Sequence, residues 1–350
     1  MNHSLESTEK GSLPPFRLPF CMFIHQDVKL NHKFDSVYNK GINVQGGMGM
    51  NWSYIEVPLR YGQGKHGVEK GPSKLRTLGL ETLLPAETKQ QTIRVLPESE
   101  LLNSEEHLKR VDGVLYTVQE LAEVVDAEIR AKRFPLIVGG DHSMAIGTLA
   151  GLAKTGPYGV IWVDAHADLN TGETSPSGNI HGMPLAAAMG MGDIRLTEVG
   201  GREPKLAPEH LVYMALRDID EGEIREINRL GIKVITVEEI RTRGVDVMME
   251  EALSYLRTRV DRFYLSFDMD SLDAKLVPGT GTPVDQGLTV EEGKAILAEA
   301  MKADDLIAVE LVELNPSLDH NDTTAHLAFE LCKTILKSKE NLLLENKPVS

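Results

Sequence analysis

Cysteine is nearly absent from this chain of 350 residues. The two that occur, Cys21 and Cys332, lie far apart and match no disulfide or zinc-binding spacing. So little cysteine excludes a disulfide-stapled scaffold, and we expect a reducing, cytoplasmic compartment. Long apolar runs are also missing. None reaches the ~18–20 residues needed to cross a bilayer, so no membrane partner is expected.

Basic residues are outnumbered by acidic ones, with 37 Lys and Arg against 52 Asp and Glu and a net charge of −15. Binding to a phosphate backbone needs basic patches, so we do not expect a nucleic-acid partner. A negative field would attract a cationic substrate, although the same charge is also typical of plain solubility.

A regular alternation of strand-like and helix-like segments starts near Trp52 and continues without a linker. Hydrophobic residues make up 41% of the sequence, which is enough for one large core. We therefore expect one catalytic domain over residues 51–340. Residues 1–50 show no sustained periodicity and are predicted to form an N-terminal extension, disordered in part. Residues 341–350 are predicted to form a C-terminal tail.

Apolar runs that predict buried strands alternate with amphipathic stretches that predict helices. The expected strands are 53–58, 92–96, 134–142, 158–163, 210–216, 233–237, 262–270 and 306–312. The expected helices are 72–84, 104–133, 183–191, 245–259, 289–303 and 323–337. This alternation predicts a single-domain, three-layer α/β/α fold with a mostly parallel sheet of about eight strands.

Polar residues follow the run 158–163 at a spacing that suggests a metal site. If the backbone stays extended, Asp164, His166 and Asp168 point to one face. They would lie at the carboxyl edge of the sheet, where open α/β sheets bind ligands. Such a cluster is costly unless a cation holds it together. The alternative is a polar loop whose aspartates cap the next helix.

Two other strands end in the same kind of residue. The strand from Phe134 ends in His142, and the strand from Arg262 ends in Asp268 and Asp270. If these strands are parallel neighbours, four aspartates and two histidines meet at one edge. Asp141 is expected to cap a helix or to support the cluster from behind.

Four motifs occur here in the order found in one enzyme family: GDHS (140–143), DAHAD (164–168), SFDMD (266–270) and GTP (281–283). With them the chain resembles the ureohydrolases, and among these the arginases most closely, over about residues 52–337. The resemblance implies an eight-stranded α/β fold, two Mn²⁺ ions per subunit and hydrolysis of a guanidino group to urea. It also implies a homo-oligomer, either a trimer or a hexamer.

The resemblance also implies which residues bind metal. His142, Asp164, Asp168 and Asp268 are the expected ligands of one ion, and Asp164, His166, Asp268 and Asp270 those of the other. Asp164 and Asp268 would bridge the two ions. This hard, oxygen-rich set lacks thiolates and suits Mn²⁺.

The remaining expected site residues contact the substrate. His181 matches the family's proton shuttle, and Glu313 matches the carboxylate that pairs with the guanidinium group. Thr282 is a second contact at that end of the substrate.

Members of the family differ in how they bind the end of the substrate opposite the guanidino group. The pattern Asn170…SGNIHG (177–182) resembles the arginase loop in which Asn170 and Ser177 hold an α-carboxylate. Asp220 would pair with the α-amino group. L-Arginine is therefore the expected substrate, although Glu173 adds a negative charge near the carboxylate pocket.

Two alternatives remain open. The first is a ureohydrolase acting on another guanidino compound, such as agmatine or guanidinobutyrate. The second is a non-catalytic regulatory or binding member of the family, which predicts the loss of a metal ligand; every ligand position is occupied here.

Overall fold

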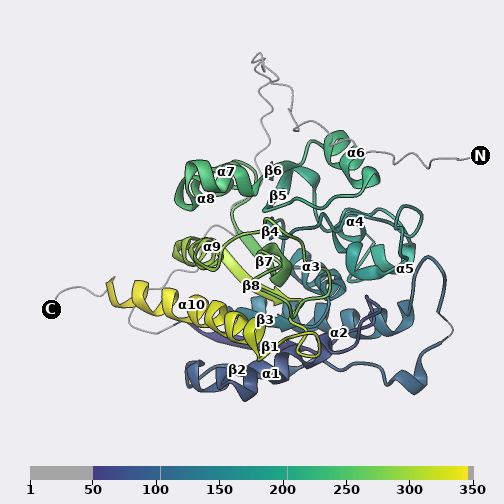
Figure 1. Ribbon diagram of the computed structural model, residues 1–350, viewed down its shortest axis with the longest axis horizontal. Helices are drawn as coiled ribbons and strands as arrows, with labels where there is room; N and C mark the ends of the chain where they lie inside the picture. The colour runs from purple at the N-terminus through teal and green to yellow at the C-terminus, as the bar shows by residue number, and fades with distance from the viewer. Residues whose placement is uncertain (1–49, 103, 203, 346–350) are drawn as a thin grey trace, which may run out of the picture. The chain divides into compact units, whose positions relative to one another are not determined.

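Eight strands form one sheet in the computed structural model of this chain, which describes residues 50–102, 104–202 and 204–345 (Figure 1). They are β1 Trp52–Val57, β2 Lys89–Thr92, β3 Phe134–Gly139, β4 Gly159–Val163, β5 Leu211–Met214, β6 Lys233–Ile235, β7 Phe263–Asp268 and β8 Leu306–Val312. All neighbouring pairs are parallel, in the order β2-β1-β3-β8-β7-β4-β5-β6. The predicted parallel α/β sheet is confirmed.

Helices cover both faces of this sheet, which gives the three layers expected (Figure 1). Their bounds are α1 Gly71–Thr77, α2 Val111–Arg130, α3 Ala145–Ala153, α4 Pro184–Ala188, α5 Ile194–Thr197, α6 Glu221–Leu230, α7 Val237–Arg243, α8 Val245–Arg257, α9 Val290–Lys302 and α10 Thr323–Glu345. One hydrophobic cluster joins one sheet face to α1 and α7–α10, and a second joins the opposite face to α2–α6. Successive strand residues alternate between the two clusters, because side chains of a strand point to opposite faces.

The four central strands place the site. β3, β8, β7 and β4 are consecutive in the sheet, and their register aligns Val138 with Leu311, Leu311 with Phe267, and Phe267 with Val163. The residues that follow these aligned positions therefore lie together at the carboxyl edge of the sheet. Parallel neighbours bring together candidate residues that lie far apart in the sequence.

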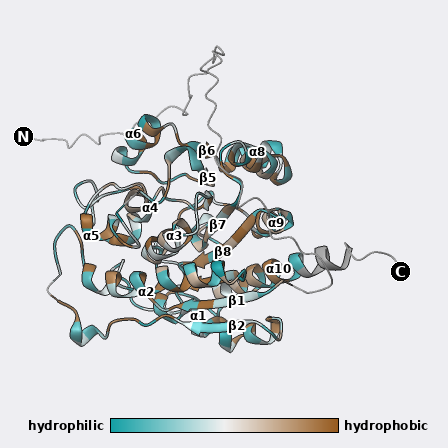
Figure 2. Cartoon of the chain, turned by 180° about the vertical axis from the view of Figure 1, so that it is seen from behind, coloured by the Kyte–Doolittle hydropathy of each residue, from teal (hydrophilic) through white to brown (hydrophobic). Residues whose placement is uncertain are grey.

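Most predicted elements differ from the observed ones by a few residues at their ends, and three differ more in where they start or whether they are continuous. The edge strand β2 is hydrophilic and precedes the apolar run 92–96 that was expected to form it (Figure 2). Ile93, just beyond the strand end, is buried, and its backbone N–H still donates to the Glu56 carbonyl of β1 at 2.8 Å. The expected helix 72–84 is split into α1 and a short 3₁₀ helix by Gly79, which has a φ of 96°. The expected helix 104–133 starts only at Val111, because Arg110 has a φ of 54°.

Helices α3, α5, α6 and α7 were not predicted. α6 and α7 each begin with a capping box, formed by Asp220 with Glu223 and by Thr236 with Glu239. This spacing of a capping residue and a glutamate is visible in the sequence and could have located both starts. α3 is buried on nearly all sides, so it lacks the amphipathic pattern by which surface helices are recognised.

The ends of the predicted domain are only partly described. α10 continues to Glu345, so residues 341–345 of the predicted tail are helical. The predicted extension lies outside the described residues except for Met50, and so do residues 346–350. No helix within the described part of the chain has the length and apolar character that crossing a membrane requires.

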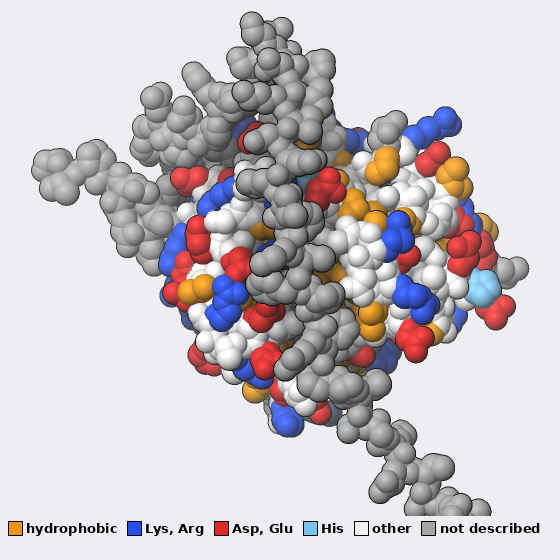
Figure 3. Space-filling model, turned by 90° about the horizontal axis from the view of Figure 1, so that it is seen from above, with side chains coloured by type: hydrophobic (Ala, Val, Ile, Leu, Met, Phe, Trp, Pro, Cys, Tyr) orange, Lys and Arg blue, Asp and Glu red, His pale blue; other side chains and the backbone are white. Residues whose placement is uncertain are grey.

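Charged side chains of both signs are spread over the face of the molecule seen in Figure 3. Several form exposed ion pairs, such as Arg257 with Asp305 at 2.8 Å. Exposed pairs of this kind contribute only about 0–1 kcal/mol each. The two hydrophobic clusters, rather than surface charge, therefore stabilise the fold.

Candidate metal centre and cavity

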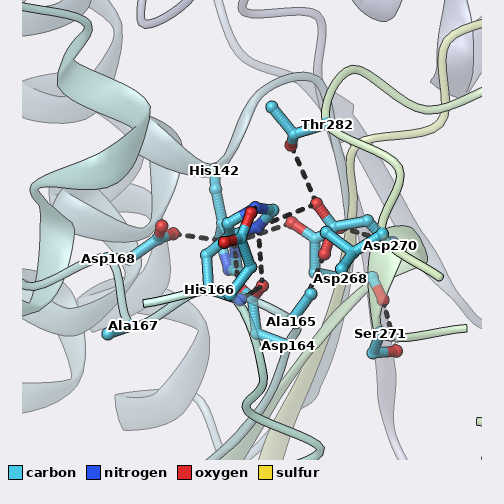
Figure 4. Close-up of polar contacts among 12 residues, drawn as sticks. His142, Asp164, Ala165, His166, Ala167, Asp168, Asp268, Asp270, Ser271 and Thr282 are labelled. Atoms are coloured by element: carbon cyan, nitrogen blue, oxygen red, sulfur yellow. Dashed lines mark hydrogen bonds and ion pairs between the residues drawn. The ribbon is translucent and has the colours of Figure 1, made fainter. Parts of the chain in front are cut away.

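The carboxyl ends of β3, β4 and β7 bring one imidazole nitrogen against three carboxylates (Figure 4). His142 Nδ1 lies 3.1 Å from Asp164 Oδ2 and 3.0 Å from Asp268 Oδ2. Asp168 Oδ2 lies 3.2 Å from the same nitrogen. The structure thus brings these four predicted residues together.

The second imidazole lies beside the same cluster. His166 Nδ1 is 3.2 Å from Asp270 Oδ2 and 3.6 Å from Asp164 Oδ1. Its other ring nitrogen, Nε2, is 3.5 Å from Asp218 Oδ2. Asp164 therefore contacts both imidazoles, one with each carboxylate oxygen.

The donor set fits metal ions. Among the described residues, the buried Nδ1 of His142 has no hydrogen-bond partner, although three carboxylate oxygens surround it. The ligand atoms of His142, Asp164 and Asp268 lie within 4.8 Å of one another, and so do those of Asp164, His166 and Asp270. Oxygen and imidazole donors without thiolate suit a hard divalent cation. Each group could hold a metal ion, with Asp164 shared between them.

The backbone reaches this arrangement by a route that the sequence did not predict. Residues 165 and 166 form a bend, and Asp168 has a φ of 50°. The assumption that the chain stays extended after Val163 is therefore wrong. The bend is held by the backbone N–H of His166, which donates to Asp164 Oδ1 at 2.7 Å. Such side-chain-to-backbone bonds compete with extended structure at aspartates.

Burial and neighbouring charges shift the pKa values of the side chains in this cluster. Burial raises the pKa of Asp168 to about 6, with a further contribution from the Asp164 carboxylate. Burial also favours the neutral form of His142, but the surrounding carboxylates outweigh it and raise the pKa of the imidazole. His166 shows the same balance, so its pKa is raised as well. The cluster thus attracts positive charge, and a cation would compete with these protons.

A buried layer behind His142 fixes its ring. Its Nε2 lies 2.8 Å from Ser266 Oγ, and the Tyr264 hydroxyl donates to Glu310 next to that serine. The ring stacks on Trp162 at 4.1 Å between centroids and 6° between planes. Contacts of this kind hold a ligating imidazole in one tautomer and orientation. The sequence analysis missed Ser266 and Glu310, because buried strand residues look like core.

A cavity of about 210 Å³ opens above the cluster. Most of the predicted site residues line it. They are His142, His166, Asp168, Asn170, Ser177, His181, Asp220, Asp268, Asp270 and Thr282. Asp164 and Glu313 do not line the cavity, and both are buried. Glu223 lines it as well and was not predicted; it accepts hydrogen bonds from the backbone N–H groups of Leu169 and Asp220.

Glu313 lies beneath the cavity with both carboxylate oxygens engaged. Oε1 accepts the backbone N–H of His142 at 2.9 Å, and Oε2 accepts Gln63 Nε2 at 2.8 Å. His181 Nδ1 lies 3.5 Å from Oε1. Gln63 is a further residue that the sequence analysis missed, because it comes from a loop 250 positions away.

The predicted substrate contacts at the mouth also have partners within the chain. Asn170 Nδ2 donates to Asp220 Oδ2 at 2.9 Å, while Ser177 Oγ accepts the backbone N–H of Asn179 at 3.2 Å. Thr282 Oγ1 donates to Asp270 Oδ2 at 2.9 Å, which ties the loop after β7 to the cluster (Figure 4). Asp141 caps the turn after β3 by accepting from Ser143 N, so its expected capping role is confirmed.

Comparison with known proteins assigns this arrangement to a family. The model of the Arginase family matches residues 51–337. The chain belongs to the arginase family. An arginase from Bacillus caldovelox is 43% identical over 293 residues, which cover 82% of this chain and 98% of that protein. Its native structure has a TM-score of 0.78 at 40% identity, covering 86% of this chain and 100% of that one.

Another solved member of the arginase family extends the comparison to a complex. The arginase of Entamoeba histolytica in complex with L-ornithine has a TM-score of 0.76 at 34% identity, covering 83% of this chain and 99% of that one. Family membership makes the present protein a hydrolase that acts on an amidino bond.

Proposed function

We propose that this protein is a binuclear manganese hydrolase that converts L-arginine and water to L-ornithine and urea. The observation that carries the proposal is the pair of metal-capable groups that share Asp164 below the cavity, in a chain of the arginase family. The cavity mouth carries Asn170, Ser177 and Asp220, which can recognise an α-amino acid.

The chain's own ligand atoms would hold two ions side by side. His142, Asp164, Asp168 and Asp268 would hold one ion, and Asp164, His166, Asp268 and Asp270 would hold the other. When bound, two such ions lower the pKa of water towards neutrality and so supply a nucleophile. The hard donor set supports Mn²⁺ over metals that prefer thiolate ligands. The complete set of six ligand positions argues against a non-catalytic member of the family.

Glu313 and His181 act on the guanidino end of the substrate. The Glu313 carboxylate would pair with the guanidinium group and orient its carbon towards the ligand cluster. Burial favours neutral His181, but the nearby Glu313 carboxylate outweighs it and raises the pKa of the imidazole. His181 therefore holds a proton that it can deliver to the departing amine nitrogen as the C–N bond breaks.

The direct test is product formation from a panel of guanidino compounds. Purified protein loaded with Mn²⁺ should release urea and ornithine in equal amounts from L-arginine. Agmatine and guanidinobutyrate should be poorer substrates by kcat/KM. No urea from L-arginine, together with turnover of agmatine or guanidinobutyrate, would replace arginine as the substrate within the same family.

The carboxylate end is tested by Ser177→Ala, with Glu173→Gln as the control. Ser177 lines the cavity, whereas Glu173 is exposed and does not. A hydrogen bond to a charged group is worth ~1.5–3 kcal/mol, so Ser177→Ala should lower the arginine-to-agmatine ratio of kcat/KM by roughly 10-fold. Glu173→Gln should change KM for arginine by less than about twofold, since solvent screens its charge. An unchanged ratio in Ser177→Ala would remove Ser177 from carboxylate recognition.

The proposal includes a cytoplasmic location and assembly into a homo-oligomer. The scarcity of cysteine supports a cytoplasmic protein. The family resemblance supports a homo-oligomer, either a trimer or a hexamer, and light scattering on the purified chain distinguishes these from a monomer.

A further inference from the structure

Arg110 joins three segments around the cavity. It immediately precedes α2, is half-buried and has a left-handed backbone with φ of 54°. Its Nε donates to the Tyr61 carbonyl at 3.0 Å, and its Nη2 donates to the Gln63 carbonyl at 2.6 Å. The same Nη2 lies 3.5 Å from Asn179 Oδ1, on the loop that lines the cavity mouth. The guanidinium group offers its N–H donors in a rigid planar fork, whereas all donors of a lysine radiate from one nitrogen at the end of a flexible chain.

The loop that Arg110 holds touches the groups at the guanidino end of the site. Gln63 Nε2 donates to Glu313 Oε2 at 2.8 Å. The carbonyl of Gly62 accepts the backbone N–H of His181 at 3.0 Å. Residues 61–63 therefore contact both residues assigned to the guanidino end, Glu313 through its carboxylate and His181 through its backbone.

The loop 61–63 is tightly packed against its neighbours. A Cβ at Gly62 would collide with the side chains of Asp141 and Ser143, and the Gly62 N–H donates to Asp141 Oδ2 at 2.9 Å. On the other side, a Cβ at Gly113 in α2 would collide with the Tyr61 ring. The start of α2 and the turn after β3 thus enclose the loop. Arg110 supplies the polar contacts between the loop backbone and the helix start.

We infer that Arg110 is a positioning residue of the reaction, which sets Glu313 and His181 through the loop 61–63. The inference rests on the proposed function, because it assigns those two residues to the guanidino end. Arg110 does not line the cavity and contacts neither the ligand cluster nor Glu313 directly. Its effect passes through Gln63 and the Gly62 carbonyl. A small misplacement of reacting groups is costly, on the order of 10²-fold per ångström.

The test compares Arg110→Lys with Arg130→Lys in the full chain loaded with Mn²⁺. Arg130 ends the same helix and likewise donates to a loop carbonyl, that of Lys154 at 2.9 Å, but far along the helix from the loop 61–63. Arg110→Lys should lower kcat for L-arginine by about 10- to 100-fold, with KM changed less than kcat and bound metal unchanged. Arg130→Lys should keep kcat within about twofold, as is usual for exposed sites.

A double variant separates positioning from general loss of structure. If Arg110 acts through Gln63, Arg110→Lys should slow a Gln63→Ala background by less than it slows the unmodified chain, since coupled sites are not additive. Unchanged kcat in a folded Arg110→Lys protein, or equal slowing in both backgrounds, would overturn the inference. The proposed function fails separately, if the unmodified chain releases no urea from L-arginine.

Discussion

The Asp164→Asn variant is expected to release urea from L-arginine at least about 10³-fold more slowly than the unmodified chain. Asp164 is the residue that both metal-capable groups share, and its two oxygens face different imidazoles. Asparagine keeps the size of the side chain but removes the negative charge and one anionic oxygen. Both ions should therefore bind more weakly, and the several kcal/mol that they contribute to the transition state should be lost.

The measurement is kcat/KM together with bound metal per chain. Asp273→Asn is the matched control, because Asp273 follows the same strand, β7, but its carboxylate accepts backbone hydrogen bonds from nearby loops and belongs to neither metal-capable group. It should retain metal and stay within about twofold of the unmodified rate, because Asp273 neither lines the cavity nor belongs to a metal-capable group. An Asp164→Asn protein that keeps both its metal and its activity would contradict the assignment of Asp164 as a shared ligand.

The His181→Asn variant should lower kcat by about 10²- to 10⁴-fold, the usual contribution of a positioned general acid. His181 lines the cavity and lies against Glu313 but belongs to neither metal-capable group. Metal content should therefore stay the same while proton delivery to the leaving amine is lost. KM should change much less than kcat, because the groups that bind the substrate remain.

Metal analysis decides between the two roles that a histidine can have here. Retained metal with low kcat identifies a proton donor, whereas loss of metal along with activity would make His181 a ligand instead. His210→Asn serves as the control, since His210 lies in the turn before β5 and outside the cavity. Its activity should match that of the unmodified chain.

The convergence of the candidate ligands could be predicted from the sequence because they follow recognisable buried strands. His142 follows β3, Asp164 follows β4, and Asp268 ends β7. Parallel pairing places the ends of neighbouring strands at one edge, so chemistry at strand ends can be located without coordinates. The prediction of convergence was right even though the extended backbone assumed after Val163 was wrong.

The supporting residues could not be found in this way. Gln63 contacts Glu313 across 250 positions, and Arg110 contacts its loop across 47 and 49. Nothing in the local pattern of a glycine-rich loop or of a helix start indicates such a partner. Ser266 and Glu310 were hidden for another reason, since polar groups within an apolar strand read as part of the core. The start of α2 was misplaced because the left-handed Arg110 interrupts an otherwise helical pattern.

The central claim is that this acidic cluster holds two divalent ions on which hydrolysis of L-arginine depends. A titration of the metal-free chain with Mn²⁺, following bound metal and urea release in the same samples, tests it most directly. The account predicts no urea before metal is added and a plateau of activity near two ions per chain. Full activity without metal, or an inactive chain with both ions bound, would contradict it.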